Sequence, residues 1–306
     1  TLLQIVLLLI GSMPLYDALT ITFGTAGTGG FAIKGDSIAG YSSYLQWVIT
    51  IFMILFGVNF NAYYLILFRK FKKAAAMEEV RYYFLVIIAA TAFITWSLCS
   101  TAMGFAEALK HAAFQVASII TTTGFATTDF NLWSGSCQVI LVLLMFIGAC
   151  AGSTGGGIKV SRFVLLLKTV KKELNSYIHP KSIKKIKIDS KPVEHEVVRS
   201  TNVYFITFMI LFVTSIFIVS LEGQDLVTTF TAVATTINNV GPGLAGVGPM
   251  SNFAHLSNLS KIVLMFDMLA GRLELFPLLI LFHPSLWKDA FQQRVKRKKT
   301  AIETGY

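Results

Sequence analysis

The sequence predicts an all-α integral membrane protein built from repeated units: a helix, a re-entrant half-helix with its loop, and a second helix. Two observations lead to this prediction. First, 54% of the 306 residues are hydrophobic and only 14% are charged, which is too apolar for a soluble domain of this size. Second, three Thr-rich stretches, at residues 17–31, 111–125 and 225–242, each run into a glycine between long apolar segments.

The apolar segments come first because they set the number of crossings. A membrane-spanning helix needs about 20 mainly apolar residues. Five runs meet this length: residues 44–68, 80–101, 137–167 (with an interruption), 201–221 and 261–282. The opening stretch, residues 2–10, is too short to span alone, and we expect it to be the end of a further helix.

Charge placement orients these segments. Basic residues crowd positions 69–81, 159–199 and 288–299, whereas the stretches that hold the three repeats carry only Lys34 and Lys110. By the positive-inside rule, the basic loops and the C-terminus are expected to be cytoplasmic in a multi-pass protein of the cell (inner) membrane. Contact with anionic lipid is a further use for these lysines. The net charge of +10 does not indicate nucleic-acid binding, because no basic patch alternates with exposed aromatic residues.

The Thr-rich stretches divide the chain into units. Aligning Gly30, Gly124 and Gly241 gives unequal spacings, which indicates inserted loops. We expect two complete pore units, one unit that lacks most of its outer helix, and two basic cytoplasmic segments. These are a partial unit at 1–75, a complete unit with a glycine-broken inner helix at 76–170, a linker at 171–197, a complete unit at 198–286 and a tail at 287–306.

The loop of each unit has the chemistry of a cation filter. Irregular backbone is tolerated in a membrane only where it is buried in protein or lines a watery cavity, and there its carbonyl oxygens can replace the hydration shell of a monovalent ion. Glycine supplies the dihedral angles that such a loop needs. The simpler alternative is three glycine-rich turns that only pack. The residues expected to supply filter carbonyls are Gly27, Thr28, Gly29, Gly30, Thr121, Thr122, Thr123, Gly124, Asn238, Asn239, Val240 and Gly241.

The apolar run at residues 137–167 is interrupted by five glycines, Gly148, Gly152, Gly155, Gly156 and Gly157, together with Ser153. Each glycine costs a helix about 1 kcal/mol relative to alanine, so we expect this segment to be unwound inside the membrane. Close helix packing through small residues is the alternative. The segment is not a phosphate-binding Walker loop, because Ile158 separates the last glycine from Lys159.

The last apolar run contains the charged residues Asp267, Arg272 and Glu274. A charge at the membrane centre costs at least about 2.5–3.5 kcal/mol, so these side chains are expected to face the protein interior or water. An ion pair of Arg272 with Glu274 or Asp267 is possible, but neither spacing places the two side chains on one helix face.

These residues together resemble the Trk/Ktr/HKT superfamily of potassium transporters, and within it the TrkH type. The matching stretches are TAGTGGF, ITTTGFATTDFNLW, GACAGSTGGGIKVSR, NNVGPGLAGVGP and MLAGRLELFP. The resemblance implies four units around one pseudo-fourfold, potassium-channel-like pore, a homodimer, and a cytosolic TrkA-type nucleotide-binding ring as regulatory partner. Because three units are visible, we expect a carboxy-terminal fragment that lacks the first pore unit. A three-unit protein completed by another subunit is the alternative.

The resemblance also implies roles for individual residues. Glycine at all three filter positions resembles the potassium-selective branch of the superfamily. Arg272 is implied to be an electrostatic barrier in the pore below the filter. The implied gate is a loop beneath the filter that obstructs the pore and moves, formed by Gly152, Ser153, Thr154, Gly155, Gly156, Gly157 and Lys159.

The expected function is therefore potassium uptake through a selective, gated pore in the lipid bilayer. K+ is the transported and filter-bound ion, the chain itself needs no cofactor, and the nucleotide belongs to the regulatory ring, to which the basic segments would dock. The alternative is a secondary transporter coupled to Na+ or H+ that works by alternating access. Repeats of one orientation favour the pore. An enzyme is not expected, because the sequence offers no nucleophile and base pair, metal cluster or cofactor fingerprint.

Overall fold

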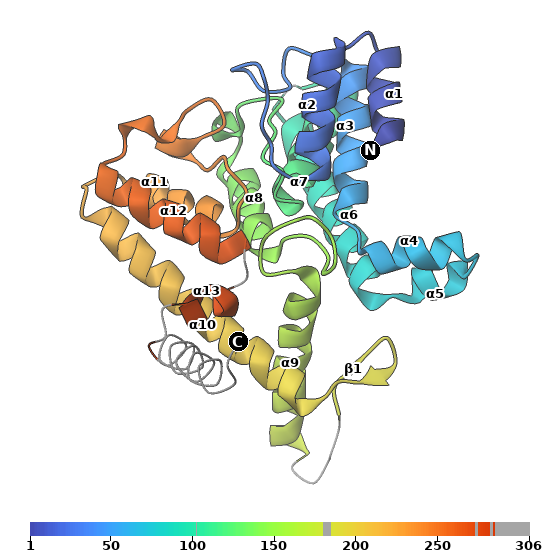
Figure 1. Cartoon of the computed structure of the whole chain (residues 1–306), viewed down its shortest axis with the longest axis vertical. Helices are drawn as coiled ribbons and strands as arrows, with labels where there is room; N and C mark the ends of the chain where they lie inside the picture. Colours follow the sequence, from blue (N-terminus) through green and yellow to red (C-terminus); the bar gives the residue numbers. More distant parts are fainter. Residues whose placement is uncertain (102, 180–184, 273–274, 282–283, 285–306) are drawn as a thin grey trace, which may run out of the picture.

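The computed structural model describes residues 1–101, 103–179, 185–272, 275–281 and 284. The predicted tail at 287–306, with its basic residues, and Glu274 lie outside this part of the chain. The described residues form an all-α fold with one short β-hairpin. Three groups of helices follow one another around a shared centre, coloured blue, green and orange in Figure 1.

The first unit consists of five helices. They are α1 (Leu2–Ile10), α2 (Leu15–Ala26), α3 (Ser43–Phe56), α4 (Phe60–Leu67) and α5 (Phe71–Ala76). Helix α3 begins at Ser42, whose hydroxyl accepts the Leu45 amide N–H and so satisfies a donor that the helix leaves free. Helices α1, α2 and α3 share one apolar core, with Leu8, Ile21 and Ile49 fully buried in it.

The predicted crossing at residues 44–68 is not one straight helix, and whether it is a single span stays a prediction. Helices α3 and α4 meet at 92°, and the chain breaks between them at Gly57. A β-carbon at Gly57 would lie 2.2 Å from the Tyr83 hydroxyl oxygen, so a larger residue at this turn would force the buried Tyr83 side chain to move. Asn59 then starts α4, because its side chain accepts the Asn61 amide N–H.

The second unit contains the longest interruption of an inner helix. Its elements are α6 (Glu78–Cys99), α7 (Phe105–Ile120), η1 (Phe130–Leu132), α8 (Gly135–Ile147) and α9 (Val160–Ile178). The helix expected at residues 137–167 is interrupted between α8 and α9. We call residues 148–159 the glycine loop. Figure 1 shows it as a wide turn between α8 and α9 near the centre of the molecule.

The third unit follows a short hairpin. The strands β1 (Lys187–Ile188) and β2 (Lys191–Pro192) are antiparallel. The helical elements are α10 (His195–Ser220), α11 (Leu226–Ile237), η2 (Ala245–Val247), η3 (Phe253–His255), α12 (Asn258–Arg272) and α13 (Leu275–Leu281). Their apolar side chains form a separate core, in which Val233 of α11 and Leu264 of α12 are buried.

Within the part of the chain that the structure describes, two helices, α6 and α10, are long and apolar enough to cross a membrane, and the bent pair α3–α4 makes a third if it is counted as one span. The predicted crossing at residues 137–167 is divided between α8 and α9, and the one at residues 261–282 includes positions outside the described residues, so five crossings stay a prediction. Helix α10 exposes Ile206, Ile210, Val213 and Phe217. Apolar side chains on the outside of a long helix suit contact with lipid.

One packing rule joins the units. The short helices α2, α7 and α11 are the three predicted half-helices, and the inner helix of one unit packs against the half-helix of the next: α3 against α7, and α8 against α11. The preceding helix of the same unit packs on each half-helix too, as α1 on α2, α6 on α7 and α10 on α11. This rule brings the C-terminal ends of the three half-helices to the centre.

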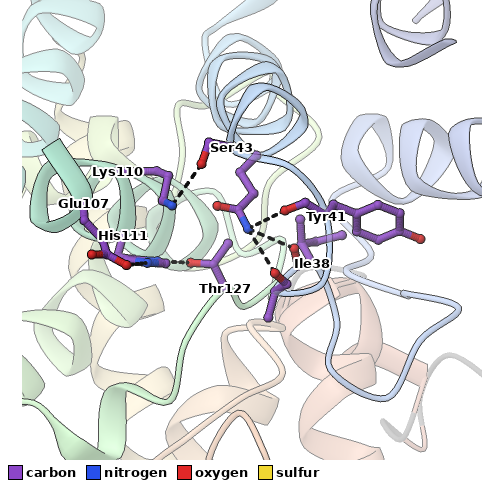
Figure 2. Close-up of polar contacts among 9 residues, drawn as sticks. Ile38, Tyr41, Ser43, Glu107, Lys110, His111 and Thr127 are labelled. Atoms are coloured by element: carbon purple, nitrogen blue, oxygen red, sulfur yellow. Dashed lines mark hydrogen bonds and ion pairs between the residues drawn. The ribbon is translucent and has the colours of Figure 1, made fainter. Parts of the chain in front are cut away.

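Polar side chains tie the loops that follow the first two half-helices to the helices beside them (Figure 2). The buried Gln46 on α3 donates its amide Nε2 to three carbonyl oxygens of the loop at residues 38–41. His111 on α7 lies 3.0 Å from the Thr127 hydroxyl (Nδ1 to Oγ1). Both loops are therefore anchored to neighbouring helices at residues that follow Gly30 and Gly124 in the sequence.

Candidate ion-conduction site

The three half-helices end in the same backbone motif. The amide N–H groups of Gly29, Thr123 and Val240 each donate to the carbonyl five residues earlier at 2.8 Å, and the N–H groups of Thr28, Thr122 and Asn239 each donate three residues back at 3.0–3.2 Å. This pair of bonds is a Schellman motif, which satisfies carbonyls that a helix end leaves free. We call residues 27–30, 121–124 and 238–241 the first, second and third filter segments.

The left-handed residue that ends each half-helix is not glycine. Thr28, Thr122 and Asn239 have φ angles of 50°, 56° and 57°. This conformation is rare for a β-branched residue and costs about 1–2 kcal/mol. The sequence predicts a stop at glycine, but the glycines come two residues later and have positive φ as well. Their values are 65° at Gly30, 86° at Gly124 and 107° at Gly241.

The filter segments lie side by side in chain order. A β-carbon at Gly30 would be 1.8 Å from the Thr123 carbonyl oxygen, and one at Gly124 would be 2.2 Å from the Val240 carbonyl oxygen. Each glycine thus allows the next backbone to approach closely. Gly241 has no atom of another described residue within 4 Å of such a β-carbon. The three segments therefore form an arc that is open beyond Gly241.

A cavity of about 700 Å³ occupies the open side of this arc. The first and third filter segments line it through Gly27, Thr28, Gly29, Asn239, Val240 and Gly241. Helix α12 supplies the opposite wall with Leu264, Met265, Met268 and Arg272. Backbone oxygens of two filter segments and one guanidinium group thus border a mostly apolar space.

The glycine loop lies directly against the filter segments. A β-carbon at Gly155 would be 3.0 Å from the Thr121 carbonyl oxygen, and one at Gly156 would be 2.7 Å from the Asn238 carbonyl oxygen. The Gly156 amide N–H donates to Thr122 Oγ1 at 2.6 Å. A chain without side chains at these two positions can therefore pass beneath two filter segments.

The left-handed residues connect the filter segments to the parts below them. Thr28 Oγ1 donates to the Thr154 carbonyl at 2.9 Å, and Thr122 accepts from the glycine loop as described above. The equivalent Asn239 instead donates Nδ2 to the Met268 carbonyl of α12 at 3.1 Å. Each of these three residues has a positive φ angle, and each uses its polar side chain to connect the end of a half-helix to another element. These bonds explain why the left-handed position carries a polar residue.

Arg272, the last residue of α12, bridges the first filter segment and the glycine loop. Its Nη1 donates to the Thr154 carbonyl and its Nη2 donates to the Gly27 carbonyl, both at 3.1 Å. Asp267, the alternative partner within the same helix, accepts instead from Ser215 Oγ at 2.8 Å. The guanidinium group is thus held by backbone oxygens on the side of the cavity.

The other residues of the predicted gate shape the glycine loop itself. Gly152, Gly157 and Lys159 have positive φ angles of 68°, 75° and 80°. Lys159 donates its Nζ to the Gly155 carbonyl, and Ser153 Oγ donates to the Cys150 carbonyl at 2.6 Å. The loop is therefore a defined structure with its own internal hydrogen bonds.

Comparison with known proteins identifies the family. The model of the TrkH family, described as "Cation transport protein", matches residues 82–294. The chain belongs to the TrkH family. It is 33% identical over 284 residues to the Trk system potassium uptake protein TrkH of Salmonella typhimurium. This alignment covers 90% of this chain and 58% of that protein. It is also 33% identical to the Trk system potassium uptake protein TrkG of Escherichia coli, again over 58% of the relative.

A solved structure gives the same result. The crystal structure of the potassium transporter TrkH from Vibrio parahaemolyticus matches this TrkH-family chain with a TM-score of 0.86 at 31% identity. The match covers 94% of this chain and 62% of that one. The chain thus spans a little over half the length of the TrkH-family relatives that it matches.

One residue of the site in this TrkH-family chain is missing from the sequence predictions. Glu79 on α6 is only 8% exposed, and it accepts hydrogen bonds from the backbone on both sides of the glycine loop, from Ala151 N–H at 2.6 Å and from Ser161 N–H at 3.2 Å. The available signal in the sequence was a pair of glutamates, Glu78 and Glu79, at the very start of an apolar run.

Proposed function

We propose that this TrkH-family chain supplies three of the segments of a potassium-selective filter, together with the gate beneath it, and that the pore serves potassium uptake. The observation that carries the proposal is the repeated backbone of the filter segments, in which a glycine lets each segment lie against the carbonyl of the next. Two relatives that match most of the chain are named as potassium uptake proteins.

The chemistry of this arrangement suits a monovalent cation. Carbonyl dipoles from several segments can together replace the hydration shell of K+. The segments carry hydroxyl and amide side chains but no carboxylate, so they offer partial charges rather than the full negative charges of divalent-cation filters. The described residues also contain no group of three His, Cys, Asp or Glu side chains that could hold a metal ion.

A fourth segment of the same kind would complete the filter. The resemblance to the superfamily implies a pseudo-fourfold pore, and the arc of three segments is open beyond Gly241. The cavity of about 700 Å³ between the third and first filter segments is the place where such a segment would fit. The proposal does not depend on whether another stretch of chain or another subunit provides it.

The gate in this proposal is the glycine loop, and Arg272 is the barrier. The loop lies beneath the second and third filter segments, and the guanidinium group beside it repels cations. Movement of the loop away from the filter would break its bonds to Thr28 and Thr122. Opening would therefore be a change between two discrete positions of the loop.

We further propose the orientation and partners implied by the sequence. The basic segments around α9 and the hairpin face the cytoplasm, and the protein resides in the cell (inner) membrane. It acts as a homodimer with a TrkA-type nucleotide-binding ring on the cytoplasmic side. Lysines on α9 and the hairpin would provide the docking surface.

The test is a flux measurement on the protein in vesicles, with and without its nucleotide-bound partner. We expect Rb+, used as a tracer for K+, to enter much faster than Na+, and the nucleotide-bound partner to change the Rb+ rate. Equal Rb+ and Na+ rates would contradict a selective filter. Rb+ uptake that stops when the Na+ or H+ gradient is removed would instead indicate the coupled carrier.

A further inference from the structure

Glu79 is a buried carboxylate on the opposite side of the glycine loop from the filter. Burying a carboxylate is costly unless hydrogen bonds replace the lost water. Three donors surround Glu79: Ala151 N–H at 2.6 Å, Ser161 N–H at 3.2 Å and Asn59 Nδ2 at 3.1 Å. All three belong to segments around the glycine loop rather than to α6 itself.

Two of these donors lie on either side of the glycine run. Ala151 precedes the run at Gly155, Gly156 and Gly157, and Ser161 follows it in the first turn of α9. Glu79 Oε1 accepts from both, so a single oxygen atom holds the two ends of this part of the loop together. The amide at the start of α9 suits this bond, because a helix N-terminus carries partial positive charge.

The third donor brings in the break of the first inner helix. Asn59 starts α4 and donates to Glu79 Oε2. Its neighbours also bind the loop, since Phe60 N–H donates to the Gly152 carbonyl at 3.1 Å and Cys150 N–H donates to the Gly57 carbonyl at 3.0 Å. The turn between α3 and α4 and the carboxylate of α6 thus form one support for the loop.

We infer that Glu79 is a positioning residue that clamps the glycine loop in its closed position beneath the filter. This inference rests on the proposed gate. On the filter side, the loop is held by neutral hydroxyls and by Arg272. On the other side, a charged oxygen binds both ends of the moving part, so the clamp must release before the loop can leave the pore.

The neighbouring residue Glu78 provides a matched control. Its carboxylate binds Lys168 in an ion pair whose side chains are 23% and 26% exposed, and its backbone N–H donates to Asp189. Glu78 has the same charge, helix and turn as Glu79 but makes no described bond to the glycine loop. This partly exposed ion pair lies away from the glycine loop, so its loss should not change how the loop is held.

The first test measures the loop directly. Cys150 is fully buried at the start of the loop, so its reaction with a methanethiosulfonate reagent reports how often the loop opens when the charge beside the thiol is unchanged. Glu79→Asp keeps that charge, and we expect a faster reaction in Glu79→Asp as well as in Glu79→Gln. A faster reaction in Glu79→Gln alone would reflect the lost charge and contradict the clamp. In vesicles, with Cys99 and Cys137 replaced by Ala, Glu79→Gln should raise the reaction rate of Cys150 at least about tenfold, which corresponds to about 1.4 kcal/mol. Glu78→Gln should leave the rate within about twofold of the parent.

The second test measures conduction. Glu79→Gln should raise Rb+ flux in the absence of the partner, while the ratio of Rb+ to Na+ flux stays as in the parent, because no filter segment is altered. Glu79→Asp keeps the charge but shortens the side chain, so it should give intermediate values and serves if the amide variant does not fold.

The outcomes separate the two proposals. Faster Cys150 labelling without Rb+ flux in the parent would support the clamp and contradict the pore. Rb+ flux in the parent with Cys150 labelling unchanged in both Glu79 variants would overturn the clamp and leave the pore standing.

Discussion

The half-helices and the inner helices of this chain behave in opposite ways. Helices α2, α7 and α11 end in the same motif, with the same hydrogen bonds and with positive φ angles at the same two positions. The inner helices share no such end. Helix α3 bends by 92° into α4, α8 gives way to the glycine loop, and α12 carries Arg272 in its last described turn.

The difference follows from what each region supplies. A filter needs equivalent carbonyl oxygens from each unit, and the backbone provides these only if each segment has the same conformation. A gate needs one movable obstruction and fixed contacts around it. In the proposed function, the inner helices therefore supply a support, a movable loop and a barrier, while the filter segments share one backbone conformation.

The largest expected effect comes from a methyl group inside the arc. In Gly124→Ala the new β-carbon would lie 2.2 Å from the Val240 carbonyl oxygen, at a φ of 86°. The left-handed conformation alone costs about 1–2 kcal/mol, so we expect Rb+ flux to fall at least about tenfold. The control is Gly104→Ala at the N-terminal end of α7, the helix that leads to Gly124. The added β-carbon there has no atom of another described residue within 4 Å, so this variant should conduct as the parent does. Normal flux in Gly124→Ala would show that the filter segments are not packed in this way.

A smaller effect, of opposite sign, is expected at the barrier. Arg272→Ala removes the bonds to Gly27 and Thr154 and the positive charge beside the cavity, so Rb+ flux should rise several-fold. The control is Lys261→Ala, which removes a cation from the same helix and the same cavity. Lys261 donates instead to the Ala254 carbonyl, and its loss should change flux little. Equal changes in the two variants would mean that general charge, and not the position of Arg272, limits conduction.

The smallest effect is expected where the two regions meet. Thr122→Val keeps the side-chain shape but leaves the buried Gly156 amide without its acceptor, at a cost of about 1–3 kcal/mol. We expect a lower melting temperature in detergent and a modest rise in Rb+ flux. The control is Thr236→Val, because among the described residues the Thr236 hydroxyl donates to carbonyls of its own helix and not to the glycine loop. A rise in flux for the control but not for Thr122→Val would break the link between filter and loop.

Local chemistry explains what could be predicted from the sequence. The membrane class follows from composition, and the register of Gly30, Gly124 and Gly241 follows from the Thr-rich stretches before them. The structure places these glycines at equivalent positions because the conformation of a helix end depends on a few neighbouring residues. The interruption at residues 148–159 is local too, since several glycines fall in one short stretch.

Contacts between distant residues explain what could not be predicted. One glycine costs an apolar helix only about 1 kcal/mol, so Gly57 did not indicate a 92° bend. The bonds of Glu79 reach residues 72 and 82 positions later. The bond from Arg272 to Gly27 spans 245 positions. No periodicity or spacing in the sequence encodes these contacts, because they exist only once the units have packed together.

The span of the Arg272 bond also has a consequence for biosynthesis. The chain is made from its N-terminus, so Gly27 and Thr154 have already been synthesised when Arg272 leaves the ribosome. Until then the glycine loop can be tied only by bonds from earlier residues such as Glu79, Thr28 and Thr122. Of the residues that hold the loop, Arg272 is therefore the last to be synthesised, and a nascent chain that stalls before α12 carries a loop without its guanidinium bridge.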